Sequence, residues 1–295
     1  MTDRLRGHLA MLAFSALIAG SFPLGAMTVQ HISPEAFTAL RFAIATGILG
    51  AVALATGGVP RTSLSAPWRY LLLGGSMAIY FVLMFEGLKT AAPVSAAAVF
   101  TLTPILSGAF GYLLLRQIMT RRMSGALTVG AAGALWVIFR GDLTALLAFA
   151  VGRGEVIYFL GCVAHALYTP MVRKLNRGER PVVFSFGAMA GAAVLLLVAG
   201  AADIARTDWA GLPPIVWITL VYTTMFATAL TFVLLQYASL RLPAAKVMAY
   251  TYLTPTWVIC WQAALGRGLP GWVVSCGVAL TIVALAMLLK DEHPA

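Results

Sequence analysis

Residues 93–115 read PVSAAAVFTLTPILSGAFGYLLL, a stretch without a single charged side chain. A transmembrane helix takes about 20 mostly apolar residues, so this stretch has the length and composition of one membrane span. Runs of the same kind occur before and after it along the whole chain. The ten predicted spans cover residues 8–28, 34–56, 67–87, 93–115, 124–140, 154–175, 181–201, 213–238, 243–265 and 270–289. The pattern predicts an all-α polytopic membrane protein with ten transmembrane helices.

The composition leaves no room for a large domain outside the bilayer. Of the 295 residues, 61% are hydrophobic and 10% are charged, whereas soluble domains carry about 25% charged residues. Ten spans use roughly two-thirds of the chain, and short loops account for the rest. A phosphate-binding loop of the form G-x-x-x-x-G-K-[ST] is absent from the sequence, so we expect no ATPase activity.

The positive charges predict the orientation of the spans. Alternate loops carry 14 and 5 Lys or Arg residues, and Arg41, inside a span, completes the 20. The positive-inside rule then places both termini in the cytoplasm of a bacterium, with the chain in its inner membrane. The first span follows two arginines but lacks a small-x-small cleavage site, so we expect a retained helix. The net charge of +10 reflects this topology and contact with lipid headgroups. Because the charges are dispersed, no nucleic-acid partner is expected.

An internal repeat divides the chain into residues 1–145 and 146–295. Two triplets recur at an offset of 151 residues: Phe81-Val82-Leu83 as Phe232-Val233-Leu234, and Leu102-Thr103-Pro104 as Leu253-Thr254-Pro255. Five crossings per half force the two copies into opposite orientations. The sequence therefore predicts two inverted five-helix repeats around a central cavity, the arrangement of many secondary transporters.

Four prolines fall inside spans at equivalent places of the two halves. They are Pro23 and Pro170, at an offset of 147, and Pro104 and Pro255, at an offset of 151. A proline removes a backbone hydrogen bond and bends its helix. These bends either act as hinges that shape a cavity or are packing kinks without function.

The repeat motifs resemble the EamA-type branch of the drug/metabolite transporter superfamily. The resemblance rests on Ala39-Leu40-Arg41-Phe42, on the two Leu-Thr-Pro triplets, and on residues 166–175, which read ALYTPMVRKL. It implies ten helices, no motor domain and the export of amino acids or other small metabolites. Within this branch the chain is most similar to bacterial aromatic amino-acid exporters. Ala188 stands at the second-half equivalent of Arg41, so any role of Arg41 is not duplicated.

His165 is the foremost candidate for substrate contact. It shares one face of its predicted helix with Tyr158, Cys162 and Tyr168 at steps of three and four residues. An imidazole can hydrogen-bond a carboxylate or an amine and can carry a proton. The alternative is a histidine whose ring is satisfied by a neighbouring carbonyl.

Aromatic residues in mid-span extend this candidate site. Tyr and Trp usually gather at membrane interfaces, so mid-span examples either line a pocket or are ordinary packing. Together with His165, the predicted substrate-binding residues are Tyr80, Phe100, Tyr168, Tyr250, Tyr252, Trp257 and Trp261.

Four charged residues within or near spans are expected to serve structure. Arg41 is predicted to pair with Glu35 or with helix-end carbonyls. Glu86 and Lys89 are three residues apart and are predicted to form a local ion pair. Lys246 either meets a substrate carboxylate or, as we favour, extends its ammonium to the interface.

The sequence thus predicts a secondary transporter, working as a monomer in lipid on a small-molecule substrate. An intramembrane enzyme would need a nucleophile and base on facing helices, but Gly74-Gly75-Ser76-Met77 lacks the last glycine of G-x-S-x-G. One mid-span histidine cannot build a metal site, so neither metal nor cofactor is expected. A channel would show a ring of charge or a carbonyl filter. The remaining alternative is an exporter of a different metabolite or drug class.

Overall fold

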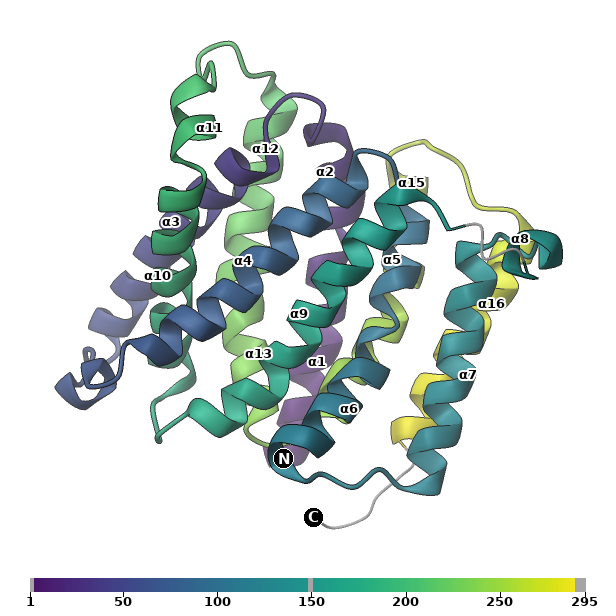
Figure 1. Ribbon diagram of the computed structural model, residues 1–295, viewed down its shortest axis with the longest axis horizontal. Helices are drawn as coiled ribbons and strands as arrows, with labels where there is room; N and C mark the ends of the chain where they lie inside the picture. The colour runs from purple at the N-terminus through teal and green to yellow at the C-terminus, as the bar shows by residue number, and fades with distance from the viewer. Residues whose placement is uncertain (1–2, 148–150, 290–295) are drawn as a thin grey trace.

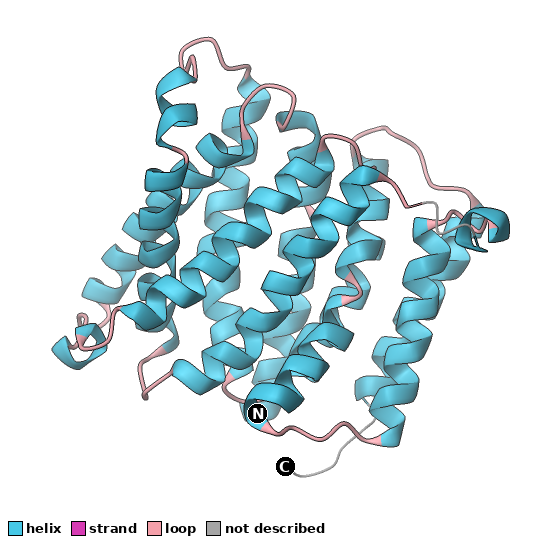
Figure 2. Ribbon diagram, in the orientation of Figure 1, coloured by secondary structure: helices cyan, strands magenta, loops and turns pink. Residues whose placement is uncertain are grey.

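Every regular element of the described chain is a helix. The computed structural model describes residues 3–147 and 151–289, and within these ranges no strand occurs (Figures 1 and 2). The first half contains α1 (Asp3–Ala19), α2 (Ser21–Thr28), α3 (Pro34–Ala55), η1 (Arg61–Leu64), α4 (Trp68–Leu88), α5 (Pro93–Phe100), α6 (Thr103–Leu115), α7 (Arg121–Ile138) and α8 (Leu143–Leu147). The second half contains α9 (Arg153–Leu175), α10 (Pro181–Ala199), α11 (Ala201–Arg206), α12 (Pro214–Thr224), η2 (Met225–Leu230), α13 (Thr231–Ser239), α14 (Ala244–Ala249), η3 (Tyr250–Leu253), α15 (Thr254–Ala264) and α16 (Trp272–Leu289). The predicted boundary at residues 145 and 146 falls inside α8 and stays a prediction.

Eight helices are long and apolar enough to cross a membrane, among the residues that the structure describes. The two other predicted spans are helical but do not meet that standard. One is α7, which begins with Arg121 and Arg122. The other, residues 244–264, is interrupted by η3 and is rich in Thr, Tyr and Trp. The protein is therefore a polytopic helical membrane protein, and the count of ten spans stays a prediction.

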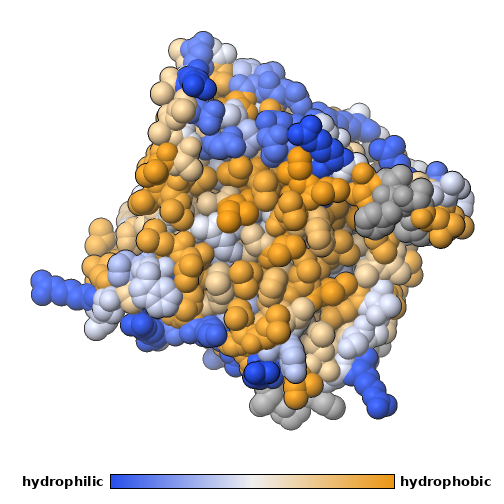
Figure 3. Space-filling view, in the orientation of Figure 1, coloured by the Kyte–Doolittle hydropathy of each residue, from blue (hydrophilic) through white to orange (hydrophobic). Residues whose placement is uncertain are grey.

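The helices stand side by side in one bundle with a hydrophobic belt. In Figure 1, α1 begins and α16 ends at the lower end of the bundle, whereas α9 begins at the upper end. The first helices of the two halves thus run in opposite directions. Figure 3 shows a broad hydrophobic band across one face, with hydrophilic groups at its upper and lower edges.

Helix packing repeats between the halves. Helix α3 packs against its counterpart α10, and α7 packs against its counterpart α16. In the same way, α4 packs against α9, and α13 packs against α1. These pairs exchange when the two halves are exchanged, so the bundle has approximate twofold symmetry in its packing.

The Leu-Thr-Pro triplets mark two equivalent interruptions. Helix α5 ends at Phe100 and α6 resumes at Thr103, while η3 lies between α14 and α15 at the matching place. Pro104 and Pro255 each occupy the second position of the resumed helix, where a missing N–H costs little. The hydroxyls of Thr103 and Thr251 lie 3.2 Å apart, so a hydrogen bond joins the two interruptions.

The other proline pair is less alike. Pro23 lies in α2, three residues after the turn at Gly20 that separates α1 from α2. Pro170 lies inside α9, which continues through it to Leu175. The hinge role of all four prolines stays a prediction.

Glycines allow α4 and α9 to approach closely. A Cβ added at Gly154 would meet the Gly87 carbonyl and would lie 2.6 Å from the backbone nitrogen of Ala91. Both neighbours are backbone atoms, which cannot turn aside. Gly187 and Gly191 likewise face Tyr70 of α4, so this G-x-x-x-G pair serves a contact within the chain.

We expect Gly154→Ala to lower the thermal unfolding temperature in detergent, because overpacking costs about 1–3 kcal/mol. Gly125→Ala is the matched control. A Cβ at Gly125 in α7 meets no atom within 4 Å, and alanine is the better helix former by about 1 kcal/mol. Equal unfolding temperatures for the two variants would contradict the close α4–α9 contact.

A buried ion pair fixes one end of α4. Arg69 and Glu179 lie 2.8 Å apart, with side chains only 1% and 5% exposed. Arg69 also donates to the Leu175 carbonyl at 2.6 Å, and the Glu179 carboxylate accepts the backbone N–H of Arg177 at 2.6 Å. The pair therefore ties the start of α4 to the end of α9 and the loop after it.

Candidate functional site

A small cavity lies between the two halves of the bundle. Its wall comes from α1, α2, α4 and α5 of the first half and from α9, η2 and α13 of the second. The lining residues are Phe14, Ile18, Ser21, Phe22, Tyr80, Phe81, Met84, Phe100, His165, Ala227, Thr231, Phe232 and Leu235. Its free volume is about 10 Å³, which is room for roughly one water molecule. The cavity is closed to any larger solute in this conformation.

His165 of α9 presents its ring to this cavity. The side chain is 3% exposed, and its ring centroid lies 4.4 Å from that of Tyr80 and 5.2 Å from that of Phe100. Among the described residues, no group hydrogen-bonds its Nδ1. The imidazole therefore keeps hydrogen-bonding capacity at the cavity wall.

Aromatic rings from α2, α4 and α5 line another part of this wall. Tyr80 of α4 stacks on Phe100 of α5, with centroids 5.8 Å apart and an interplanar angle of 29°. Its hydroxyl lies 3.1 Å from that of Tyr158 in α9. Phe22 of α2 contacts the ring of Phe100 at 6.2 Å. Such ring faces suit an apolar or aromatic solute.

The repeated Phe-Val-Leu triplets meet at the cavity. Phe81 and Phe232 are equivalent in the two halves, both line the wall, and their rings stack 6.5 Å apart at 29°. The recurrence of the triplet could have identified this pair from sequence alone. Ser21, Met84, Ala227 and Thr231 carry no comparable pattern, and sequence reasoning missed them.

Three of the eight predicted substrate-binding residues line the cavity: His165, Tyr80 and Phe100. The other five are not among its lining residues. Tyr168 accepts a hydrogen bond from Gln236 at 2.8 Å, Tyr250 is hydrogen-bonded to His8 at 3.0 Å, and Trp257 donates to Ser15 at 3.2 Å. Tyr252 packs on Gly130, and Trp261 packs against Tyr222 at 5.3 Å. Their roles as substrate contacts stay predictions.

Arg41 is fully buried in α3, beside the cavity wall. Its Nε donates to the Thr228 hydroxyl at 2.5 Å and its Nη2 to the Ala227 carbonyl at 2.9 Å. Its guanidinium also stands over the Phe81 ring, 4.1 Å from the centroid. Insertion of an arginine at the centre of a bilayer costs about 2.5–3.5 kcal/mol, and these contacts offset part of that cost.

The partners of Arg41 come from a π-helical segment, η2. In a π-helix the hydrogen bond runs to residue i−5 and part of the regular ladder is lost. Here the side-chain hydroxyl of Thr228 donates to the Thr223 carbonyl at 2.8 Å, and the Ala227 carbonyl accepts from Arg41. The Ala227 carbonyl lies within η2 of the second half rather than at a helix end, and no ion pair joins Arg41 to Glu35 among the described residues.

The remaining predicted ionic residues lie away from the cavity. Glu86 and Lys89 form an ion pair of 2.5 Å at the end of α4, as their spacing indicated. Lys246 of α14 is half-buried. Within the described ranges, no cluster of three His, Cys, Asp or Glu residues could hold a metal ion.

Comparison with known proteins agrees with this geometry. The model of the EamA-like transporter family matches residues 5–139 and again residues 152–290. The chain belongs to the EamA-like transporter family. Two family units in one chain correspond to the two halves whose packing repeats, and they meet at the aromatic cavity. The protein is a multi-pass membrane transporter of small substrates.

Two relatives cover nearly the whole chain. One is the uncharacterized transporter YyaM of Bacillus subtilis (strain 168), 25% identical over 284 residues, which cover 94% of this chain and 92% of the relative. The other is a crystal structure of a protein with 21% sequence identity and a TM-score of 0.73, covering 97% of this chain and 95% of its own. The second match shows the fold alone.

Proposed function

We propose that this EamA-family protein is a secondary transporter that exports amino acids, aromatic and other neutral ones above all, across the bacterial inner membrane. Ten helices in two inverted halves would expose the cavity alternately to either side, with both termini in the cytoplasm. The protein would act as a monomer in lipid, without cofactor or nucleic acid. The observation that most supports this proposal is the closed aromatic cavity with His165 in its wall.

The wall chemistry supports neutral solutes with apolar side chains. Rings of Phe22, Tyr80, Phe100 and Phe232 offer stacking surfaces, and His165 adds hydrogen bonding. In the described ranges, no Asp or Glu lies in the cavity wall. Coupling to protons through a buried carboxylate is therefore not part of the proposal, and a solute gradient can drive the cycle.

Transport by purified protein in liposomes tests the proposal. We expect wild type to accelerate entry of labelled phenylalanine and leucine, and His165→Ala to reduce this at least about fivefold, the factor for the loss of about 1 kcal/mol from one hydrogen bond. His31→Ala, at an exposed position, is the matched control and should transport as wild type does. A wild-type protein that moves no amino acid but moves another metabolite or drug would assign the alternative substrate class.

A further inference from the structure

Arg41 carries a buried positive charge without a protein counter-ion. Among the described residues, no Asp or Glu lies within ion-pair distance of its guanidinium. Three acidic side chains in span helices or their loops have other partners: Glu86 pairs with Lys89, Glu155 accepts from Ser95, and Glu179 pairs with Arg69. Glu35, in the first turn of α3, forms no ion pair with Arg41. A fully buried cation in low dielectric attracts any anion that can reach it.

The guanidinium has one nitrogen to spare. Nε and Nη2 are held by Thr228 and Ala227, but Nη1 has no hydrogen-bond partner in the described part of the chain and is shielded from solvent. Unpartnered buried donors are rare and call for an explanation. Carboxylates and phosphates are the anions that guanidinium groups bind most strongly. Of the two, the carboxylate is the group that the solutes of the proposed function carry.

Arg41 is a neighbour of the cavity wall. Arg41 does not itself line the closed cavity, but two residues that it touches, Phe81 and Ala227, do. In its closed form the cavity holds about 10 Å³, so a solute that enters must push this wall outward. Movement of the Phe81 ring or of η2 would bring the solute to the guanidinium.

The described lining of the cavity has no negatively charged side chain that could pair with the ammonium group of a solute. Its polar lining side chains are Ser21, Tyr80, His165 and Thr231, and none of them is a carboxylate. A zwitterion bound there would gain one ion pair with Arg41, and its ammonium would face hydroxyls and ring faces, which attract a cation but do not neutralise it. A plain carboxylate would neutralise Arg41 without that cost.

We propose that Arg41 is the anion-binding group of this transporter and that its preferred solutes are monocarboxylates with an aromatic or apolar body, the amino group being dispensable. The inference rests on the proposed function, since it concerns the same cavity. It makes the carboxylate, rather than the amino-acid backbone as a whole, the feature that is recognised.

Competition in proteoliposomes tests this assignment with wild-type protein. Uptake of labelled phenylalanine is measured against 3-phenylpropionate, phenylalaninamide and phenethylamine, which keep the ring but differ in the carboxylate and the amine. We expect 3-phenylpropionate to inhibit at a concentration at least about tenfold below that of the amide or the amine. Equal inhibition by the amide or the amine would overturn the assignment.

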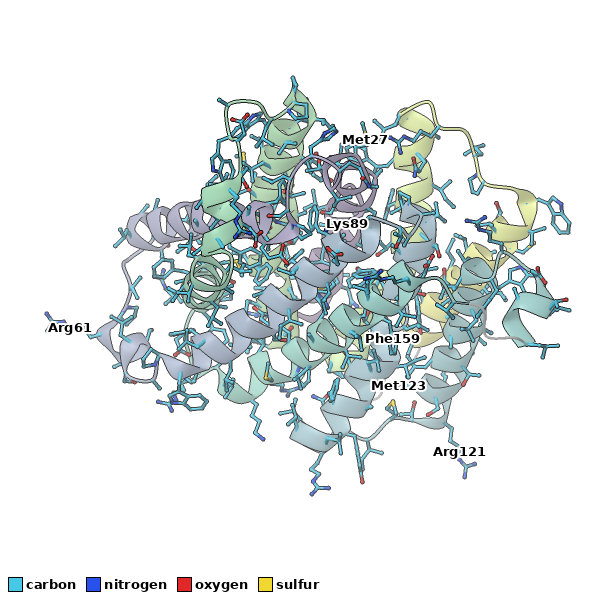
Figure 4. All side chains as sticks on the ribbon, turned by 45° about the horizontal axis from the view of Figure 1, so that its top comes forward. Met27, Arg61, Lys89, Arg121, Met123 and Phe159 are labelled. Carbon is cyan, nitrogen blue, oxygen red and sulfur yellow. The ribbon has the colours of Figure 1, made fainter. Side chains whose placement is uncertain are left out.

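Variants then locate the effect. Arg41→Gln should abolish the preference for 3-phenylpropionate, while Arg41→Lys should retain part of it. Arg61→Gln is the matched control, because Arg61 is exposed and points away from the bundle (Figure 4). An Arg41→Gln protein that folds and keeps the full preference would refute the proposal, and if that variant does not fold, the wild-type series alone decides.

A binding measurement separates this inference from the proposed function. Thermal stabilisation of detergent-purified wild type by 3-phenylpropionate needs no transport. If phenylalanine is not transported but 3-phenylpropionate stabilises the protein more than phenethylamine does, the proposed function fails and the role of Arg41 stands. If transport occurs and the carboxylate brings no advantage in either assay, the proposed function stands and the role of Arg41 is refuted.

Discussion

Replacement of Ser21 by tryptophan is expected to slow transport by about 5- to 150-fold. Ser21 is buried in the wall of a cavity of about 10 Å³, which cannot take an indole ring. In the proposed cycle the protein must pass through this closed form in each direction. Overpacking destabilises such a form by about 1–3 kcal/mol, and that increase in barrier corresponds to the stated range of rates. Initial rates of phenylalanine entry into proteoliposomes measure the effect.

Ala190→Trp is the matched control for this insertion. Ala190 of α10 lines a separate surface groove of about 330 Å³, together with Tyr70, Leu71 and Val194. The same ring has room there, and transport should remain close to wild type. Ser21→Ala, which inserts no bulk, should also transport. Normal rates for a folded Ser21→Trp protein would show that the solute takes another route.

Glu179→Gln is expected to lower the free energy of unfolding by about 3 kcal/mol, because removing one partner of a buried ion pair leaves the other charge unpaired. Arg69 would keep its hydrogen bonds to the carbonyls of Leu175 and Ala66 but lose its charged partner at residue 179. The unfolding temperature in detergent should fall by roughly 5–10 °C. Asp208→Asn, at an exposed carboxylate, serves as the control and should have little effect.

The same pair predicts how stability depends on pH. Desolvation raises the pKa of Glu179, but the hydrogen bonds from Arg69 and from the Arg177 backbone outweigh it, so the pKa lies below its ordinary value. Because the pKa of Glu179 is lower in the folded state, its carboxylate contributes its full stabilisation at pH values above the unfolded-state pKa of about 4.3. This contribution is lost as the pH falls through the folded-state pKa. Wild type should lose more stability below pH 4 than Glu179→Gln does. Parallel curves of stability against pH for the two proteins would contradict a stabilising ion pair between Arg69 and Glu179.

Much of the architecture follows from local sequence. A run of about 20 apolar residues has one stable state in lipid, a helix, since only a helix satisfies every backbone group within one segment. The predicted spans therefore coincide with helical segments throughout the described chain. The recurrence of Leu102-Thr103-Pro104 as Leu253-Thr254-Pro255 also marked the places of the two helix interruptions, because proline removes a backbone hydrogen bond and is best accommodated in the first turn of a helix.

The site was less accessible to sequence reasoning. Nearly every position of these helices is apolar, so helical periodicity does not separate a cavity-facing ring from a packed one. Tyr168 and Tyr252 are as aromatic and as central as Tyr80, yet their rings pack on Phe232 and Gly130. The π-helical segment η2 has no sequence mark that we recognise, and with it the partners of Arg41 could not be foreseen.

By itself the amino-acid sequence determined a helical membrane protein with a repeated, oppositely directed pair of halves. Hydrophobic length and internal recurrence are one-dimensional properties, and the bilayer converts an apolar run of sufficient length directly into a helix. The cytoplasmic placement of the termini stays a prediction from the charge distribution. Only the tertiary structure decided which rings surround the cavity, that Phe81 meets Phe232 there, and that Arg41 stands beside its wall with a free nitrogen. These facts depend on the rotation and depth of each helix against its neighbours, which packing between distant residues sets.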